Sequence, residues 1–167
     1  MHLSLTVALV PPVARLPSHV MCGGAAYDYC IQSLGCTAAE AGKVERSLMV
    51  DMAKYMTYAK LEERCVWLQS TLDLSDSELK KMVMRFPALL GLTVETNMEL
   101  KLDWLQTRLD LDDLGLRKMV LTVPALLGYS VQDNMEPKLA FCEEELGLSP
   151  SEVLFNNIRS NASVLQP

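Results

Sequence analysis

The sequence is poor in the residue types from which most catalytic and metal sites are built. Its only two histidines, His2 and His19, lie close to the N-terminus, and its five cysteines form no C-x-x-C pair. No apolar run approaches the roughly 20 residues that a membrane-spanning helix needs. These absences exclude a histidine-based acid–base site on the body of the chain. They also favour buried thiols in a reducing compartment over disulfides or zinc ligands.

Positive charge is also scarce. The 167 residues carry 15 Lys and Arg against 21 Asp and Glu, a net charge of −6. Domains that bind nucleic acid are usually basic, so this balance argues against indiscriminate binding, although a local basic stripe can exist on an acidic protein. Half of the residues are apolar, which predicts a folded domain of ordinary size.

The acidic clusters do not resemble a catalytic pair. Asp112 stands where a helix is expected to begin and is best explained as its cap. The three glutamates at residues 143–145 would spread around a helix instead of converging. We therefore expect no catalytic residue, no bound metal and no cofactor.

The chain contains a stretch that occurs twice. Residues 64–100 and 101–137 align without a gap at a period of 37, and 20 of the 37 aligned positions are identical. A self-similar period of about 20 to 50 residues is typical of solenoids and other repeat arrays. The longest shared segment is Pro87–Gly91 with Pro124–Gly128, and Asn97–Glu99 also recurs as Asn134–Glu136.

Weaker copies flank these two units. Residues 27–63 form a degenerate first unit with one extra residue and without the Pro-Ala-Leu-Leu-Gly turn. Residues 138–167 begin a further unit that is truncated, so we expect a fragment, a degenerate copy, or an edge that a protein partner covers. Residues 1–26 contain no acidic residue and three prolines, which suits a transit peptide or a disordered leader, and they are left out of the predicted fold.

Each unit is predicted to contain three helical pieces. The first piece has apolar residues four, three and four positions apart, which places them on one face of a helix. In two successive units these residues are Leu61, Cys65, Leu68 and Leu72, and Met98, Leu102, Leu105 and Leu109. No segment alternates with a period of two. The predicted class is therefore all-α, an α-solenoid of stacked units.

The second helical piece has clear start and stop signals. It begins after Ser75, Asp112 or Ser149, whose side-chain oxygens can accept a free backbone N–H. It ends at Pro87 or Pro124, where Pro-Ala-Leu-Leu-Gly forms a short third turn. Capping-box spacing occurs in Thr37–Glu40, Ser75–Glu78 and Ser149–Glu152. The residues expected to cap the next unit's first helix are Thr93 and Ser130.

One aromatic residue per unit recurs on the first helix. Trp67, Trp104 and Phe141 stand at equivalent positions. We expect them to form a stacked row that packs between units, and base stacking is the alternative role.

The complete pattern resembles the mitochondrial transcription termination factor (mTERF) family. The residues that carry it are Leu146–Glu152 before a second helix, Pro-x-Leu-Leu at its end, and Glu136–Cys142 at the start of the next unit. The resemblance covers residues 34–167. It implies a left-handed superhelix of three-helix units in a mitochondrion or chloroplast, without catalytic activity. It also implies binding of double-stranded DNA or RNA through a basic groove.

Two ladders of cations recur at the repeat period and are the predicted nucleic-acid-binding residues. The first ladder, on the first helices, is Arg64, Lys101 and Lys138. The second ladder, on the second helices, consists of Lys81 and Lys118 with the neighbouring Lys80, Arg117 and Arg85. Phosphate contacts need only donors and positive charge, so either ladder could position a duplex. The alternative interpretation is a solvated helix face.

These observations lead to two functional hypotheses. In the first, the protein is an organellar nucleic-acid-binding regulator of transcription, its termination or transcript processing. In the second, it is a helical scaffold whose acidic surface recruits a basic protein, such as a ribosome-assembly partner. A ladder that gathers on one face, with the acids on another, would favour the first hypothesis.

Overall fold

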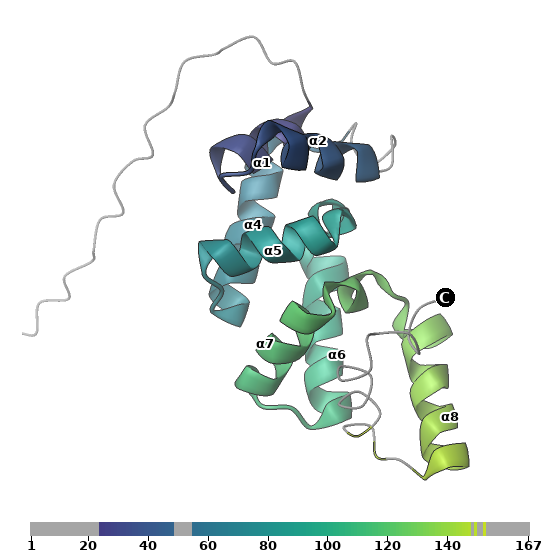
Figure 1. Cartoon of the computed structure of the whole chain (residues 1–167). Helices are drawn as coiled ribbons and strands as arrows, with labels where there is room; N and C mark the ends of the chain where they lie inside the picture. Colours follow the sequence, from purple (N-terminus) through teal and green to yellow (C-terminus); the bar gives the residue numbers. More distant parts are fainter. Residues whose placement is uncertain (1–23, 49–54, 148, 150–151, 153–167) are drawn as a thin grey trace, which may run out of the picture.

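The computed structural model describes residues 24–48, 55–147, 149 and 152. This part of the chain forms helices and no strand, as the sequence predicts. The helices follow one another as an elongated array that runs from α1 and α2 at one end to α8 at the other (Figure 1). The α-helices are α1 (Ala25–Gln32), α2 (Ala38–Ser47), α4 (Tyr58–Leu72), α5 (Asp76–Arg85), α6 (Glu99–Leu109), α7 (Asp113–Thr122) and α8 (Glu136–Leu146). Short 3-10 turns are η1 (Pro87–Gly91) and η3 (Pro124–Gly128), and π-helical turns are η2 (Val94–Met98) and η4 (Val131–Met135).

The first helix of each unit buries the predicted apolar stripe. On α4 and α6 every residue of the two stripes is buried, and none is more than 4% exposed. The equivalent residues Met135, Leu139 and Cys142 are buried at α8. Burial of each such side chain contributes about 1.5–3 kcal/mol, so the stripe is the main source of cohesion between helices.

The second helices begin and end where the sequence predicts. Ser75 accepts from the backbone N–H of Glu78, and Asp112 accepts from that of Gly115. The three capping boxes are present, including the pair Ser149 and Glu152. The prolines then end α5 and α7, and the Pro-Ala-Leu-Leu-Gly segments form the 3-10 turns η1 and η3.

Successive units stack through equivalent elements. Helix α2 contacts α5 and η1, α4 contacts α7, and η1 contacts η3. The contact at Gly128 shows how closely these elements approach, because a Cβ at this position would lie 2.5 Å from Cζ of Phe86. Glycine at the end of η3 therefore admits the ring of Phe86, which follows α5 in the preceding unit.

Three details differ from the sequence prediction. Helix α1 begins at Ala25, two residues earlier than expected, with Ala26 buried. The first helices α6 and α8 are preceded by π-helical turns, in which Met98 N donates to Thr93 O and Met135 N donates to Ser130 O. Ser130 caps its turn through Asp133, whereas Thr93 makes no such cap because its hydroxyl bonds to Thr96.

The predicted aromatic row is partly wrong. Trp67 and Trp104 pack against the core as expected, but Phe141 is 60% exposed. Among the described residues the one aromatic ring pair is Tyr29 with Tyr58, so the three repeated aromatics do not stack on one another. Phe141 lies on α8, and no helix that follows α8 in the described part of the chain covers it.

The cysteines behave as small apolar residues. Cys30, Cys36, Cys65 and Cys142 are buried and free, as predicted, and Cys22 lies outside the described residues. Burial raises the pKa of the Cys65 thiol to about 11. A thiol with such a pKa stays protonated at neutral pH and is a poor nucleophile.

Candidate nucleic-acid interface

The first-helix ladder points into the protein. Arg64 Nη1 donates to Leu90 O in η1 at 2.5 Å, and Lys101 Nζ donates to Leu127 O in η3 at 2.6 Å. Lys101 is only 9% exposed, and burial lowers the pKa of its ammonium group from the usual 10.5. Lys138 is half-buried at the equivalent position of α8. These cations hold the third turn of a unit against its first helix, so the geometry gives Arg64 and Lys101 an internal role. Contact with nucleic acid stays a prediction for this ladder.

Two other predicted cations join neighbouring units. Lys80 on α5 donates to Gly35 O at 2.9 Å and forms an ion pair with Glu40 at 3.2 Å. Arg117, one period later on α7, does the same with Asp73 O at 3.2 Å and Glu78 at 2.8 Å. We call this repeated arrangement, in which a second-helix cation bonds to the preceding unit, the inter-unit latch.

The carbonyls of the latch come from left-handed residues that follow a first helix. Gly35 has φ of 58° and Asp73 has φ of 49°, so each chain turns sharply and exposes its carbonyl oxygen. The carboxylates come from the capping boxes. Bonds from Thr37 and then Lys80 lower the pKa of Glu40. Bonds from Ser75 and then Arg117 lower the pKa of Glu78.

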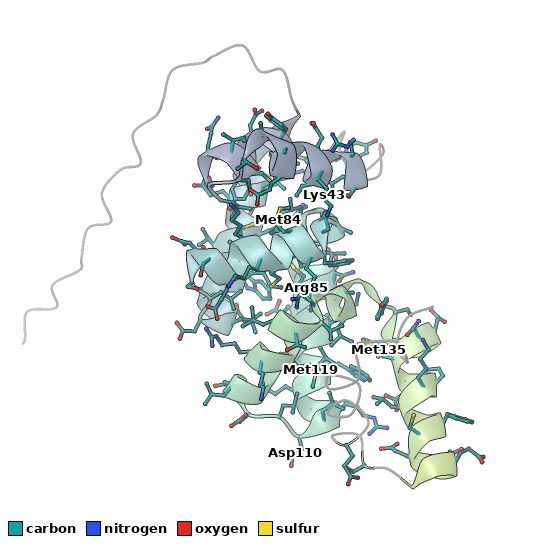
Figure 2. The ribbon with its side chains drawn as sticks, viewed as in Figure 1. Lys43, Met84, Arg85, Asp110, Met119 and Met135 are labelled. Atoms are coloured by element: carbon teal, nitrogen blue, oxygen red, sulfur yellow. The ribbon has the colours of Figure 1, made fainter. Side chains whose placement is uncertain are left out.

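Arg85 also bonds within the protein. Its Nη1 donates to Leu121 O at 3.1 Å and to Thr122 O at 2.9 Å, the last carbonyls of α7. Figure 2 shows Arg85 between α5 and α7. A cation at a helix C-terminus satisfies free carbonyls and interacts favourably with the helix dipole. Arg85 is nevertheless exposed, so part of its guanidinium faces solvent.

The exposed ladder contains one residue that the sequence analysis missed. Lys81 on α5 and Lys118 on α7 are exposed at equivalent positions, as predicted. Lys43 on α2 is exposed at the same position of the first unit, and Figure 2 shows it on the side of α2 toward α5. The extra residue of the degenerate unit separates Lys43 from Lys81 by 38 positions instead of 37 and hides it from a search at constant period. We call Lys43, Lys81 and Lys118 the second-helix lysine ladder.

Charges are distributed unequally around this ladder. The halves of α5 and α7 that follow Lys81 and Lys118 contain no acidic residue, and Glu45 on α2 bonds to Gly24 N. Exposed acids lie in the first turns of α5 and α7, at Asp76 and Asp113, and along the first helices. The exposed acids of the first helices are Glu62, Glu63, Glu99, Asp103, Glu144 and Glu145. Positive charge therefore predominates only in the second halves of α5 and α7, although the whole chain is acidic.

The fold is that of an α-helical repeat protein, a solenoid whose units stack through equivalent helices. A family model for mTERF matches the chain over residues 46–137 and again over residues 66–165. Each match spans more than half of the chain, which therefore belongs to the mTERF family. Members of this family are helical-repeat proteins that generally bind nucleic acid, typically in organelles and without catalysis. No curated protein matches the chain.

The described residues lack two further kinds of feature. They contain no group of three or more His, Cys, Asp or Glu side chains that could hold a metal ion. Within the same residues, every helix is too short or too polar to cross a lipid bilayer.

Proposed function

We propose that this mTERF-family protein binds double-stranded DNA or RNA through the second-helix lysine ladder and regulates gene expression in a mitochondrion or chloroplast. It acts without catalysis, by occupying its nucleic acid during transcription, termination or transcript processing. The observation that carries the proposal is the repetition of an exposed lysine on three successive second helices. Stacked units repeat their contacts along a linear ligand, which suits a phosphate backbone.

The acidic total is compatible with this proposal. The parts of α5 and α7 that follow the ladder lysines contain no acid, so a duplex approaching there meets the local potential of the ladder before it meets the average charge. Such a surface binds weakly and with strong salt dependence, because each neutralised phosphate contributes a slope of about −0.9 in log K against log salt. Three lysines would give a slope of about −3.

The test is fluorescence anisotropy of the full chain with labelled duplex DNA, duplex RNA and single strands across a salt series. The test variant is Lys43→Gln with Lys81→Gln and Lys118→Gln, which removes three charges and keeps most of each side-chain stem. We expect this variant to lose most of the salt slope, by about 2.5 units. The preferred duplex identifies the nucleic acid.

The matched control is Lys60→Gln, which removes an exposed lysine from the first helix α4. It should leave affinity and salt slope nearly unchanged. A folded chain that binds none of the probes at low salt would refute the proposal. The proposal would also be refuted if Lys60→Gln lost as much nucleic-acid affinity as each single ladder variant.

A further inference from the structure

A groove with an apolar floor lies between α6 and α8, on the first helices. It consists of two adjoining cavities of about 550 and 440 Å³ that share Trp104, Val131 and Gln132. The first extends along α8 to Glu136, Pro137 and Ala140, and the second along α6 to Thr96, Asn97, Leu100 and Lys101. Figure 1 shows α6 and α8 as neighbouring helices at this end of the array.

Large apolar side chains are exposed at this groove. Leu100, which lines it, is 60% exposed. Phe141 is also 60% exposed and lies one helical turn after the lining residue Pro137, on the same side of α8. Neighbouring exposed apolar groups around a hollow are typical of a protein-binding surface, whereas single ones are common everywhere.

The rim of the groove is acidic. Glu136 lines it, and Arg108 bonds to Glu136 and Glu143 at 3.0 and 2.6 Å, which leaves one net negative charge in this cluster. Glu144 follows the lining residue Ala140 by one turn of α8 and is exposed. The cation Lys101 does not offset these charges at the surface, because it is buried against Leu127 O.

The apolar floor is a property of this junction and not of the repeat. One period earlier, the positions of Gln132 and Ala140 are occupied by Glu95 and Asp103. The position of Pro137 is occupied there by Leu100. The junction between α4 and α6 therefore has acids at these floor positions. The junction between α6 and α8 has uncharged residues at the same positions, and its acids lie on the rim.

We propose that the α6–α8 groove binds an amphipathic helix of a protein partner, with the partner's apolar face on Trp104, Val131 and Leu100 and its lysines or arginines against Glu136 and Glu144. Two facts favour this occupant over a nucleic acid: the rim is negative and the floor is apolar. A helix presents apolar residues at i, i+3, i+4 and i+7, and such a stripe fits a groove bounded by two helices. The groove lies on the first helices and the lysine ladder lies on the second helices, so both can act in one protein.

The experiment uses the full chain with Trp67→Phe, so that Trp104 is its only tryptophan and reports on the groove. The probe is an 18-residue peptide of leucine and lysine with leucines at helical spacing. Two control peptides have the same composition in scrambled order, or glutamate in place of lysine. We expect saturable blue-shifted emission of Trp104 with the first peptide, weaker binding at high salt, and little response to either control.

Paired substitutions locate the site. Leu100→Lys with Ala140→Lys places positive charge on the floor and should weaken binding by at least about tenfold. Val66→Lys with Leu114→Lys makes the same change at residues that are 55% and 73% exposed outside the groove, and it should leave affinity unchanged. Circular dichroism confirms that both double variants remain helical. The variant without the ladder lysines should bind the peptide normally, which separates this proposal from the proposed nucleic-acid binding.

Four results would overturn the inference. One is equal affinity for the ordered and the scrambled peptide. Another is an equal loss of peptide affinity in the two double variants with introduced lysines. A third is self-association of the chain that Leu100→Lys abolishes, since the occupant would then be a second copy. The fourth is binding that appears only after residues 153–167 are deleted, because the chain's own segment would then fill the groove.

Discussion

The two ladders of cations differ in environment although both recur with the repeat. Arg64 and Lys101 on the first helices bond to carbonyls of the third turns, and Lys101 is buried. Lys43, Lys81 and Lys118 on the second helices are exposed. The same period within one chain therefore marks two kinds of residue, those that bond inside their own unit and those that are exposed on its surface.

The difference follows from the geometry of one unit. The 3-10 turn after the second helix leaves carbonyls that its own short helix cannot satisfy, and a long cationic side chain from the first helix reaches them. The ladder lysines of the second helices are exposed instead, beside buried residues such as Met82 and Met119. Repetition alone cannot separate these cases, but burial and hydrogen-bond partners can.

The largest expected effect is on stability when the internal ladder is broken. Lys101→Met keeps the apolar stem but leaves Leu127 O without its donor, which should cost about 1–3 kcal/mol of unfolding free energy. The matched change Lys81→Met is at an exposed site and should alter stability by less than about 0.5 kcal/mol. Urea unfolding followed by circular dichroism measures both.

The same pair separates stability from binding. Lys81→Met should reduce the salt slope of nucleic-acid binding by about one unit. Lys101→Met, measured below its unfolding transition, should leave the slope as it is. The reverse pattern would mean that Lys101 leaves its internal site to contact the ligand.

A smaller effect is expected at the inter-unit latch. Arg117→Ala removes the bonds to Asp73 O and Glu78 and should loosen the junction between the second and third units. Hydrogen exchange of the amides at the start of α5 should become faster than in the unaltered chain. Lys60→Ala, at an exposed position at the start of α4, provides the control and should leave these amides unaffected.

The latch also predicts how stability depends on pH. Glu40 and Glu78 have pKa values lowered from the usual 4.5 in the folded chain. A lowered carboxyl pKa means that the unfolded chain binds protons more readily, so stability is present above pH 4.5 and decreases as pH falls through the folded values. Thermal unfolding between pH 6 and pH 3 should show this loss. A chain with Glu40→Gln and Glu78→Gln should start less stable and lose less over the same range.

Much of the fold could be predicted because each local signal has a direct physical cause. The Ser75 and Asp112 caps, the proline stops and the apolar stripes each act within a few residues, and all of them appear in the structure. The π-helical turns before α6 and α8 could not be predicted in this way. Their i to i+5 bonds position Met98 and Met135 in the core, and this is a result of packing between units.

The candidate site was less predictable for the same reason. Lys80, Arg117 and Arg85 are polar residues on the outer parts of their helices, which is also where ligand-binding cations lie. Their actual acceptors are carbonyls 36 to 45 residues away in the sequence, and no local pattern identifies such partners. Lys43 could have been found by allowing one inserted residue in the first unit.

The smallest predicted effect concerns the left-handed residue that ends each first helix. Gly35 and Gly147 occupy this position in the outer units, but Asp73 and Asp110 occupy it in the two clear units, with φ near 50°. A left-handed residue with a Cβ costs about 1 kcal/mol, whereas glycine loses a similar amount of unfolded-state entropy on folding. Asp110→Gly should therefore stabilise the fold slightly, by no more than about 0.5 kcal/mol, whereas Asp110→Val should cost about 1–2 kcal/mol.

Asp110 is the better test position than Asp73, because the Asp73 carbonyl also accepts from Arg117 and a change there would alter the latch as well. Equal thermal unfolding of the glycine and valine variants would show that residue 110 relaxes out of the left-handed conformation, and the geometry of the turn between α6 and α7 would then not depend on it.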